Sequence, residues 1–297
     1  MRFKQPLYFI ALSLVSLCLA SCGSSSSDKV NNSDDFKEAE QERLGKQIED
    51  VIYNIPSPTE IPYLLQGTGA EFNASLINSR TKVDQYAARN DRAALNLGVY
   101  AADVGYLASY DKTQEAISHL SACKTLAENL GVIGAFDASI LQRFEANISN
   151  KDSLSILLDN AIKKTDNFLK DDSRNKLSAL VIAGSFVEGL YISTGLIKSY
   201  PKNILPDDSR NLILTPLMRV VLEQKKSVSE LLNMLGAVEQ TEPVTSMTAD
   251  LKALETAYAS LNIEEQIKNN RADLVLSDKN LTEITSVVEK MRNAITE

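Results

Sequence analysis

Two acidic residues could do chemistry, because each lies three positions before a tyrosine in a stretch rich in small and apolar residues. Asp103 precedes Tyr106, and Glu188 precedes Tyr191. Residues three apart share one face of a helix, so both carboxylates are expected among apolar and phenolic groups, where a buried acid needs a partner. If the two stretches pair, the four side chains and Tyr100 would line a pocket for a cationic or polyhydroxylated ligand.

The same residues also fit a structural role. Each carboxylate would then accept a hydrogen bond from a tyrosine hydroxyl or a helix terminus and fix how the helices pack. We favour this role, because such networks perturb acidic groups in many proteins without serving a function. General acid–base catalysis by the pair is the least favoured alternative, since a glycosidase-like hydrolase of envelope polymers needs two carboxylates about 5–9.5 Å apart in a cleft.

A second candidate pair is His119 with Cys123, which lie four residues apart and share a helix face. The pair could ligate a metal or act as base and nucleophile. A zinc site needs three or four protein ligands, however, and His119 is the only histidine. Cys123 also continues an apolar stripe, where a small thiol packs well. We therefore predict no metal site and no catalytic residue here.

Familiar catalytic and cofactor motifs are absent from the sequence. It contains no Gly-rich phosphate loop, no G-x-S-x-G elbow, no H-E-x-x-H pair and no EF-hand loop. We therefore expect a protein that is not an enzyme and that uses no cofactor.

The chain begins with the features of a cleaved signal. Arg2 and Lys4 precede an apolar stretch, residues 7–20, whose 14 residues are fewer than the roughly 20 that span a bilayer as a helix. Residues 19–22, Leu-Ala-Ser-Cys, resemble the lipobox of bacterial lipoproteins. The resemblance implies cleavage before Cys22 and attachment of several acyl chains, palmitate among them, which makes membrane anchoring effectively permanent. The alternative is an ordinary signal followed by a free thiol.

Composition argues against nucleic acid as a partner. Without residues 1–21 the chain keeps 29 basic and 39 acidic side chains, a formal charge of −10, which repels nucleic acid and anionic lipid. Residues 22–35 are rich in Ser, Asn and Asp and should form a flexible tether. Gly23 replaces the aspartate that retains some lipoproteins in the inner membrane, so we expect the outer membrane, with the periplasmic and the exterior face both open.

Residues 36–297 are expected to form one all-α domain, either an antiparallel helical bundle or stacked helical hairpins. The apolar residues recur with a helical period, and no run of alternating strand residues is convincing. Besides the helices that carry the two acid–tyrosine pairs, we expect helices at about 36–53, 111–131, 152–169, 216–236, 247–261 and 281–291. Asp111 with Gln114 is typical of a capping box that starts the second of these, and Gly131 of its end.

Small residues mark two helices that should pack closely. The first set is Gly98, Ala101, Ala102, Gly105 and Ala108, and the second is Gly184, Gly189 and Gly195. Polar residues interrupt the first stretch, so close packing in a soluble core is preferred over a membrane span. The two acid–tyrosine pairs lie 85 residues apart and two Leu-Gly helix ends 105 residues apart. These unequal offsets rule out a strict repeat and leave open a duplicated helical unit with an insertion.

Several strings resemble those of uncharacterised helical lipoproteins from Bacteroidetes-type bacteria. They are Leu64-Leu65 before Gly69-Ala70, residues 94–100 running into Asp103 and Tyr106, residues 143–147, and residues 188–191. The resemblance implies location and an all-helical fold, and it carries no activity.

Together these features favour a lipid-anchored interaction or scaffolding protein of the cell envelope, bound to lipid through Cys22 and to an envelope protein or component through a helical surface. The alternative is a small-ligand receptor with Asp103, Glu188 and the tyrosines at its pocket.

Overall fold

The computed structural model describes residues 70–132, 174–199, 224–261 and 279–297, together with isolated residues between 142 and 167 and residues 66, 218, 221 and 222. Every regular element in that part of the chain is a helix, so the predicted all-α fold is confirmed. The expected signal peptide, the tether, Cys22 and the first helix at 36–53 lie outside the described residues.

Two short 3₁₀ helices precede a set of longer α-helices. The elements are η1 (Ala74–Leu76), η2 (Arg80–Lys82), α3 (Val83–Ala87), α4 (Asn90–Ser109), α5 (Thr113–Asn129), α8 (Asn175–Ser199), α10 (Lys225–Gly236), α11 (Val244–Ser260) and α14 (Lys279–Thr296).

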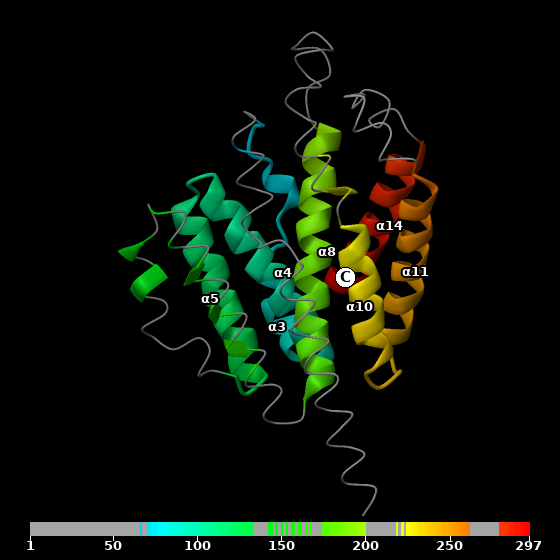
Figure 1. The fold of residues 1–297 in the computed structure, drawn as a ribbon. Helices are drawn as coiled ribbons and strands as arrows, with labels where there is room; N and C mark the ends of the chain where they lie inside the picture. Colours follow the sequence, from blue (N-terminus) through cyan, green and yellow to red (C-terminus); the bar gives the residue numbers. More distant parts are fainter. Residues whose placement is uncertain are drawn as a thin grey trace, which may run out of the picture.

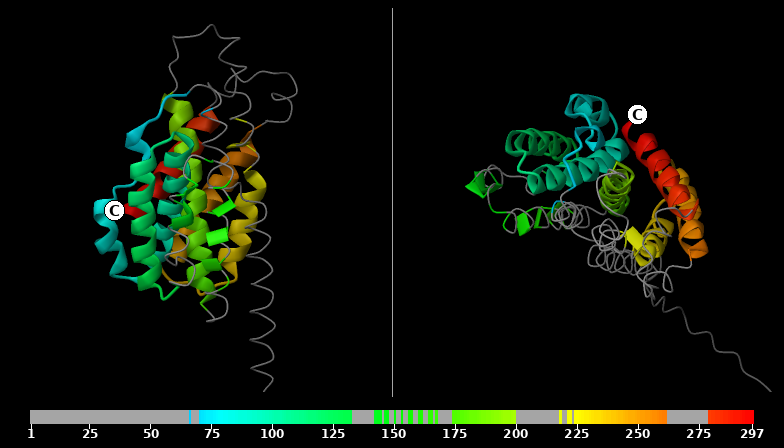
Figure 2. Two further views of the ribbon diagram at one scale, coloured as in Figure 1. Left: turned by 90° about the vertical axis from the view of Figure 1, so that its left-hand side faces the viewer. Right: turned by 90° about the horizontal axis from the view of Figure 1, so that it is seen from above.

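Most neighbouring helices are antiparallel (Figure 1). The α4–α5 pair forms one hairpin, the α10–α11 pair forms another, and α14 returns along α11. Helix α8 lies between the two groups when the molecule is seen from above (Figure 2). Its closest partner is α4, and these two central helices run in the same direction (Figure 1).

The contact between α4 and α8 depends on two glycines. A Cβ atom added to Gly98 would lie 2.1 Å from the carbonyl oxygen of Val181, and one added to Gly184 would lie 2.0 Å from that of Leu95. The two backbones therefore touch, as the small-residue pattern predicted. Gly189 is different, because a Cβ atom added there would have nothing within 4 Å, so the expectation that this glycine serves close packing is wrong.

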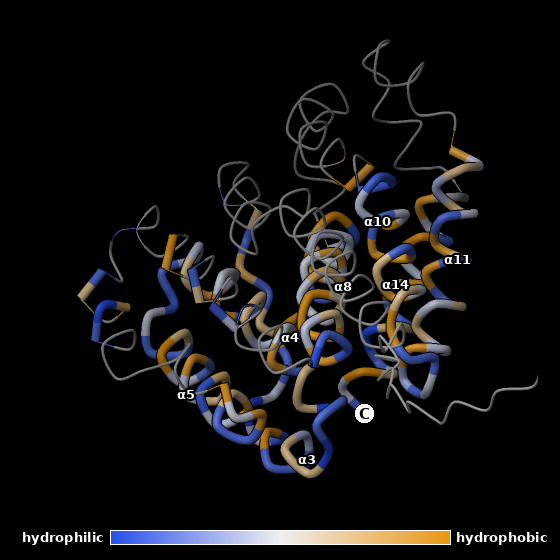
Figure 3. Tube along the Cα trace, turned by 60° about the horizontal axis from the view of Figure 1, so that its bottom comes forward, coloured by the Kyte–Doolittle hydropathy of each residue, from blue (hydrophilic) through white to orange (hydrophobic). Residues whose placement is uncertain are grey.

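Helices α4 and α8 form the centre of the core. Nearly all residues of α4 from Ala93 onward are buried, as are most residues of α8, and a helix that is apolar all round is expected to be buried on all sides. Among the described residues, α8 alone is long and apolar enough to cross a membrane, but most of it is buried inside the helical domain. Figure 3 shows the many hydrophobic residues of α8 and, by contrast, the mixture of hydrophobic and hydrophilic residues along α5.

The end of α4 explains why Asp111 does not cap α5. Asp111 has a positive φ of 58°, and the N–H of Lys112 donates to the carbonyl of Leu107 at 2.9 Å, which is the Schellman arrangement that ends a helix. Lys112 is the N-cap of α5 and makes no side-chain cap, so the predicted capping box is wrong. The predicted end at Gly131 is confirmed by its positive φ of 71°.

The remaining helical patterns agree with the burial. The apolar residues predicted to face the core are buried in α11, at Leu157 and at Ala161, and in α14 with the exception of Val287, which is partly buried. Ile156 is 60% exposed. Helix α10 ends at Gly236 as expected. The cores of both C-terminal helices therefore follow from periodicity alone: Met247, Leu251, Leu254 and Tyr258 in α11, and Leu281, Ile284, Val288 and Met291 in α14.

The glycine contact gives a first prediction. Gly98→Ala should destabilise the protein by about 3 kcal/mol, because the new methyl group meets backbone that cannot move without separating α4 from α8. Gly189→Ala is the matched control, since the added methyl group meets open space and alanine is the better helix former by about 1 kcal/mol. Denaturant unfolding followed by circular dichroism measures both, and equal stabilities for the two variants would contradict the close contact.

Candidate functional site

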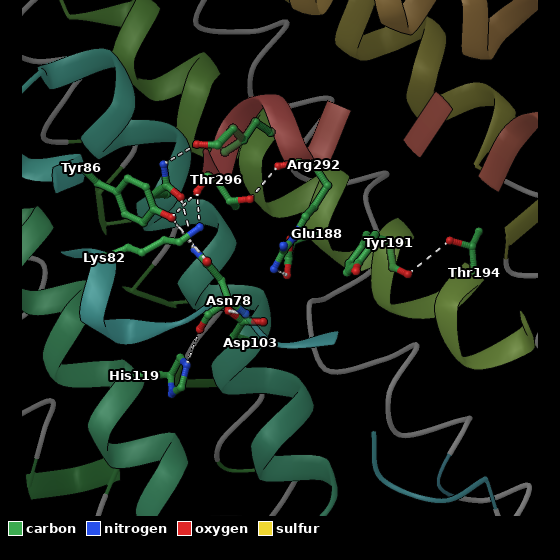
Figure 4. A network of polar contacts seen from close by, with 12 residues as sticks. Asn78, Lys82, Tyr86, Asp103, His119, Glu188, Tyr191, Thr194, Arg292 and Thr296 are labelled. Atoms are coloured by element: carbon green, nitrogen blue, oxygen red, sulfur yellow. Dashed lines mark hydrogen bonds and ion pairs between the residues drawn. The ribbon is translucent and has the colours of Figure 1, made fainter. Parts of the chain in front are cut away.

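The two predicted acids meet at the centre of the fold. Asp103 of α4 and Glu188 of α8 lie about one turn beyond the glycine contact, and both have an exposed fraction of 0%. Because the helices run in the same direction, that turn carries both carboxyl groups to one level (Figure 4). Each carboxyl group lies close enough to affect the ionisation of the other.

A third helix supplies the positive charge. Arg292 of α14 donates from Nε to Glu188 Oε2 at 3.2 Å and from Nη2 to Glu188 Oε1 at 3.4 Å. The arginine side chain is 12% exposed, and its guanidinium lies 4.7 Å from the ring centroid of Tyr191, a favourable cation–π distance. The structure therefore brings Asp103, Glu188 and Tyr191 into one cluster around Arg292.

Asp103 is less well satisfied than Glu188. Its Oδ2 accepts a hydrogen bond from the backbone N–H of Asn78 at 3.2 Å. No donor group of the described residues reaches its buried Oδ1, and the Asp103 carboxyl group can hydrogen-bond to Glu188 only when one of the two acids is protonated. Burial raises the pKa of Asp103 well above its usual range, and the nearby Glu188 raises it further. Both causes favour the protonated form of Asp103.

Glu188 keeps the negative charge of the pair. Burial raises the pKa of Glu188 too, but Arg292 opposes that shift by its charge and its hydrogen bonds, and so does the Asp103 carboxyl group. Of the two acids, Asp103 is therefore the one whose protonated form is favoured, because the guanidinium faces Glu188.

Asn78 links this cluster to the N-terminal helices. Its carbonyl contacts Nε2 of His119 at 3.0 Å, and its side-chain Nδ2 donates to Asn96 Oδ1 at 3.4 Å and to the Tyr86 hydroxyl at 3.3 Å. The asparagine is 3% exposed. One buried residue between η1 and η2 therefore joins α3, α4 and α5.

His119 and Cys123 are both used in packing. Nδ1 of His119 lies 2.9 Å from the carbonyl of Glu115, so both ring nitrogens face backbone acceptors. Burial raises the pKa of the Cys123 thiol, which is the opposite of what an activated nucleophile needs. Among the described residues no group of three or more metal-binding side chains is arranged around a common point.

The end of α14 is fastened by three side chains. Tyr86 Oη and Lys82 Nζ each donate to the carbonyl of Thr296 at 2.8 Å, and Asn96 Nδ2 donates to that of Ile295 at 3.0 Å. The last carbonyls of a helix have no partner within the helix, and a lysine there also complements the helix dipole. These contacts fix the end of α14 against η2, α3 and α4, and the Arg292 pair fixes it against α8 (Figure 4).

The other tyrosines named as pocket residues point elsewhere. The Tyr100 hydroxyl donates to the carbonyl of Ser79 at 2.9 Å. Tyr106 accepts from the Asn73 N–H at 2.8 Å and stacks on Phe72 with 5.3 Å between ring centroids. Neither hydroxyl is hydrogen-bonded to Asp103 or Glu188. The partners of the carboxylates are a guanidinium and a backbone N–H, where the structural interpretation expected tyrosine hydroxyls or helix ends.

Sequence reasoning missed two members of the cluster, Arg292 and Asn78. Arg292 carried a signal, because it is a lone cation on the apolar stripe of α14, four residues after Val288 and three before Ile295. Asn78 carried none, since it lies in an irregular segment between two short 3₁₀ helices.

The cluster can do two things chemically: its acids can bind a proton, and Glu188 can form an ion pair with Arg292 inside the domain. In this conformation the 0% exposure of both carboxylates keeps a substrate from touching them. The separation that a glycosidase needs also requires a water or sugar between the acids, whereas here an arginine of the chain occupies the site beside Glu188.

The ion pair gives a second prediction. Arg292→Met should cost about 3–5 kcal/mol of stability, because it leaves a buried carboxylate without a partner. The double variant with Glu188→Gln should recover most of that loss, since it removes both charges together. Thermal and denaturant unfolding measure the cycle.

The control is Lys198→Met, which breaks the exposed Lys198–Glu289 pair between the same two helices, with side chains 65% and 39% exposed. Exposed pairs contribute about 0–1 kcal/mol. A loss from Arg292→Met no larger than that of this control would contradict the importance of the buried pair.

The chain has no match among protein-family models, curated proteins or solved structures.

Proposed function

We propose that this protein is a lipid-anchored, non-enzymatic interaction or scaffolding protein of the bacterial cell envelope. The observation that carries the proposal is the N-terminal pattern: two basic residues, an apolar stretch of 14 residues, and Leu-Ala-Ser-Cys ending at Cys22. Charge, length and small residues before the cysteine are the requirements of a cleaved signal, and all are met together.

The described site supports a structural use of the buried groups. Glu188 is paired with Arg292 and lies beside Asp103 inside the domain, and His119 contacts two carbonyls. Side chains of the kind that catalyse reactions are thus occupied in holding helices together. The remaining surface of a helical domain is suited to contacts with another macromolecule.

A small-ligand receptor is the alternative. One observation favours it: no donor group of the described residues reaches the buried Oδ1 of Asp103. A cationic ligand would have to displace Arg292 from Glu188 and Tyr191, however, and so break contacts at 3.2 Å and 4.7 Å. We therefore place the anchoring and interaction role first.

Lipidation gives a third prediction. Cys22→Ser should move the protein from washed membranes to the soluble fraction, because several acyl chains at about 0.8 kcal/mol per buried methylene supply the attachment. Mass spectrometry of the wild-type protein should find an acylated N-terminal Cys22. Cys123→Ser is the matched control and should stay in the membrane fraction. An unmodified N-terminus, or a Cys22→Ser variant that still sediments with membranes, contradicts the anchor.

The interaction role gives a fourth prediction. Crosslinking in intact cells followed by purification of the protein should recover the same envelope partner in repeated experiments. The Cys22→Ser variant is the control, because a partner in the membrane plane should be lost when the protein is released. Recovery of no partner under several growth conditions would count against scaffolding.

A further inference from the structure

The buried cluster contains two acids, Asp103 and Glu188, and one permanently charged cation, Arg292. Asp103 and Glu188 are both fully buried, and the guanidinium of Arg292 is hydrogen-bonded to Glu188 alone of the two. No donor group of the described residues reaches the Oδ1 of Asp103. Full ionisation of both acids would thus leave a net negative charge in a place that is closed to bulk solvent.

Other ionisable groups surround the cluster. Cys123 of α5 and Tyr100 of α4 interact electrostatically with Asp103. Tyr86 of α3 interacts with Glu188 and Arg292, and Tyr191 of α8 lies against Arg292. Burial raises the pKa of Tyr86, of Tyr100 and of Cys123, so these three stay neutral. His119 is turned to the carbonyls of Glu115 and Asn78, and Lys82 to the carbonyl of Thr296.

Helix α14 is the element that can relieve this unfavourable charge. It brings the arginine, and its last turn is held by contacts from the same network, through Asn96, Tyr86 and Lys82. On its outer side it makes the ion pairs Lys198–Glu289 and Lys290–Asp250, and such pairs near the surface contribute little. The main cost of detaching α14 is therefore the exposure of its apolar stripe, whose residues Ile284, Val288 and Met291 are buried. Movement of α14 would admit water to both carboxyl groups.

We propose that Asp103, Glu188 and Arg292 form a proton-operated latch for α14. While the two acids share one proton, Glu188 and Arg292 are paired and α14 stays docked. When that proton is lost, a second buried negative charge faces the first, and the helix detaches so that water can solvate both.

The direction of the pH effect follows from proton binding. Burial and Glu188 hold the pKa of Asp103 above its usual range in the docked state, whereas in the open state the group returns towards about 3.9. Between these two values the docked state binds more protons than the open state, so its stability falls as pH rises. For one proton the limit is about a tenfold change in the opening equilibrium per pH unit.

Hydrogen exchange of the full chain in detergent solution tests the latch. Protection factors, corrected for the intrinsic effect of pH on exchange, should fall in α14 as pH rises from about 5 to 9, by up to tenfold per unit. Amides in the centres of α4 and α8 should keep their protection over the same range. Constant protection of α14 would overturn the proposal.

Two variants identify the group responsible. Asp103→Asn keeps the shape and removes the titration, so the protection of α14 should become independent of pH. Asp250→Asn removes the outer ion pair with Lys290 and should leave the pH dependence as in the wild type. A pH dependence in Asp103→Asn equal to that of the wild type would overturn the assignment.

Infrared spectra of the wild-type protein give a second readout that does not require a variant to fold. The carbonyl stretch of a protonated carboxylic acid should persist at neutral pH and disappear over the same pH range in which α14 loses protection. A spectrum without this band at neutral pH would also overturn the latch.

Discussion

The close approach of α4 and α8 at Gly98 and Gly184 is the constraint on which the rest of the structure depends. Because the backbones touch there, side chains one turn further along have no path to water, and Asp103 and Glu188 are enclosed together. Charge in such a place is costly unless it is paired or protonated. The packing of two apolar helices therefore dictates the electrostatics of the core.

That electrostatic demand explains how distant parts of the chain are joined. Arg292 reaches Glu188 across 104 residues of sequence, and Tyr86 reaches the carbonyl of Thr296 across 210. Each contact satisfies a group that would otherwise be buried alone. Helix α14 is thus attached to the N-terminal helices by polar contacts, while its apolar stripe packs on α11 and α8.

Sequence could predict what depends on local spacing. Periodicity gave the helices and their buried faces, small residues gave the glycine contact, and the acid–tyrosine spacing singled out Asp103 and Glu188. It could not predict that Asp111 would end α4 instead of capping α5. The loop between the two helices is so short that the N-cap of α5 is Lys112, the residue directly after Asp111. Tertiary partners such as Asn78 were also beyond reach, because no local pattern says which backbone N–H meets a buried carboxylate.

The buried polar groups of the helical domain stabilise the fold, and the proposed function depends on other parts of the chain. Groups that could act on a substrate are buried and already have partners: Glu188 is paired with Arg292, and His119 contacts two carbonyls. Lys82 and Tyr86 both donate hydrogen bonds to the end of α14. A domain whose polar groups are consumed in this way gains a defined register between its helices. Under the proposed function, such a domain needs chemistry only at Cys22, and its surface is left free to specify a partner.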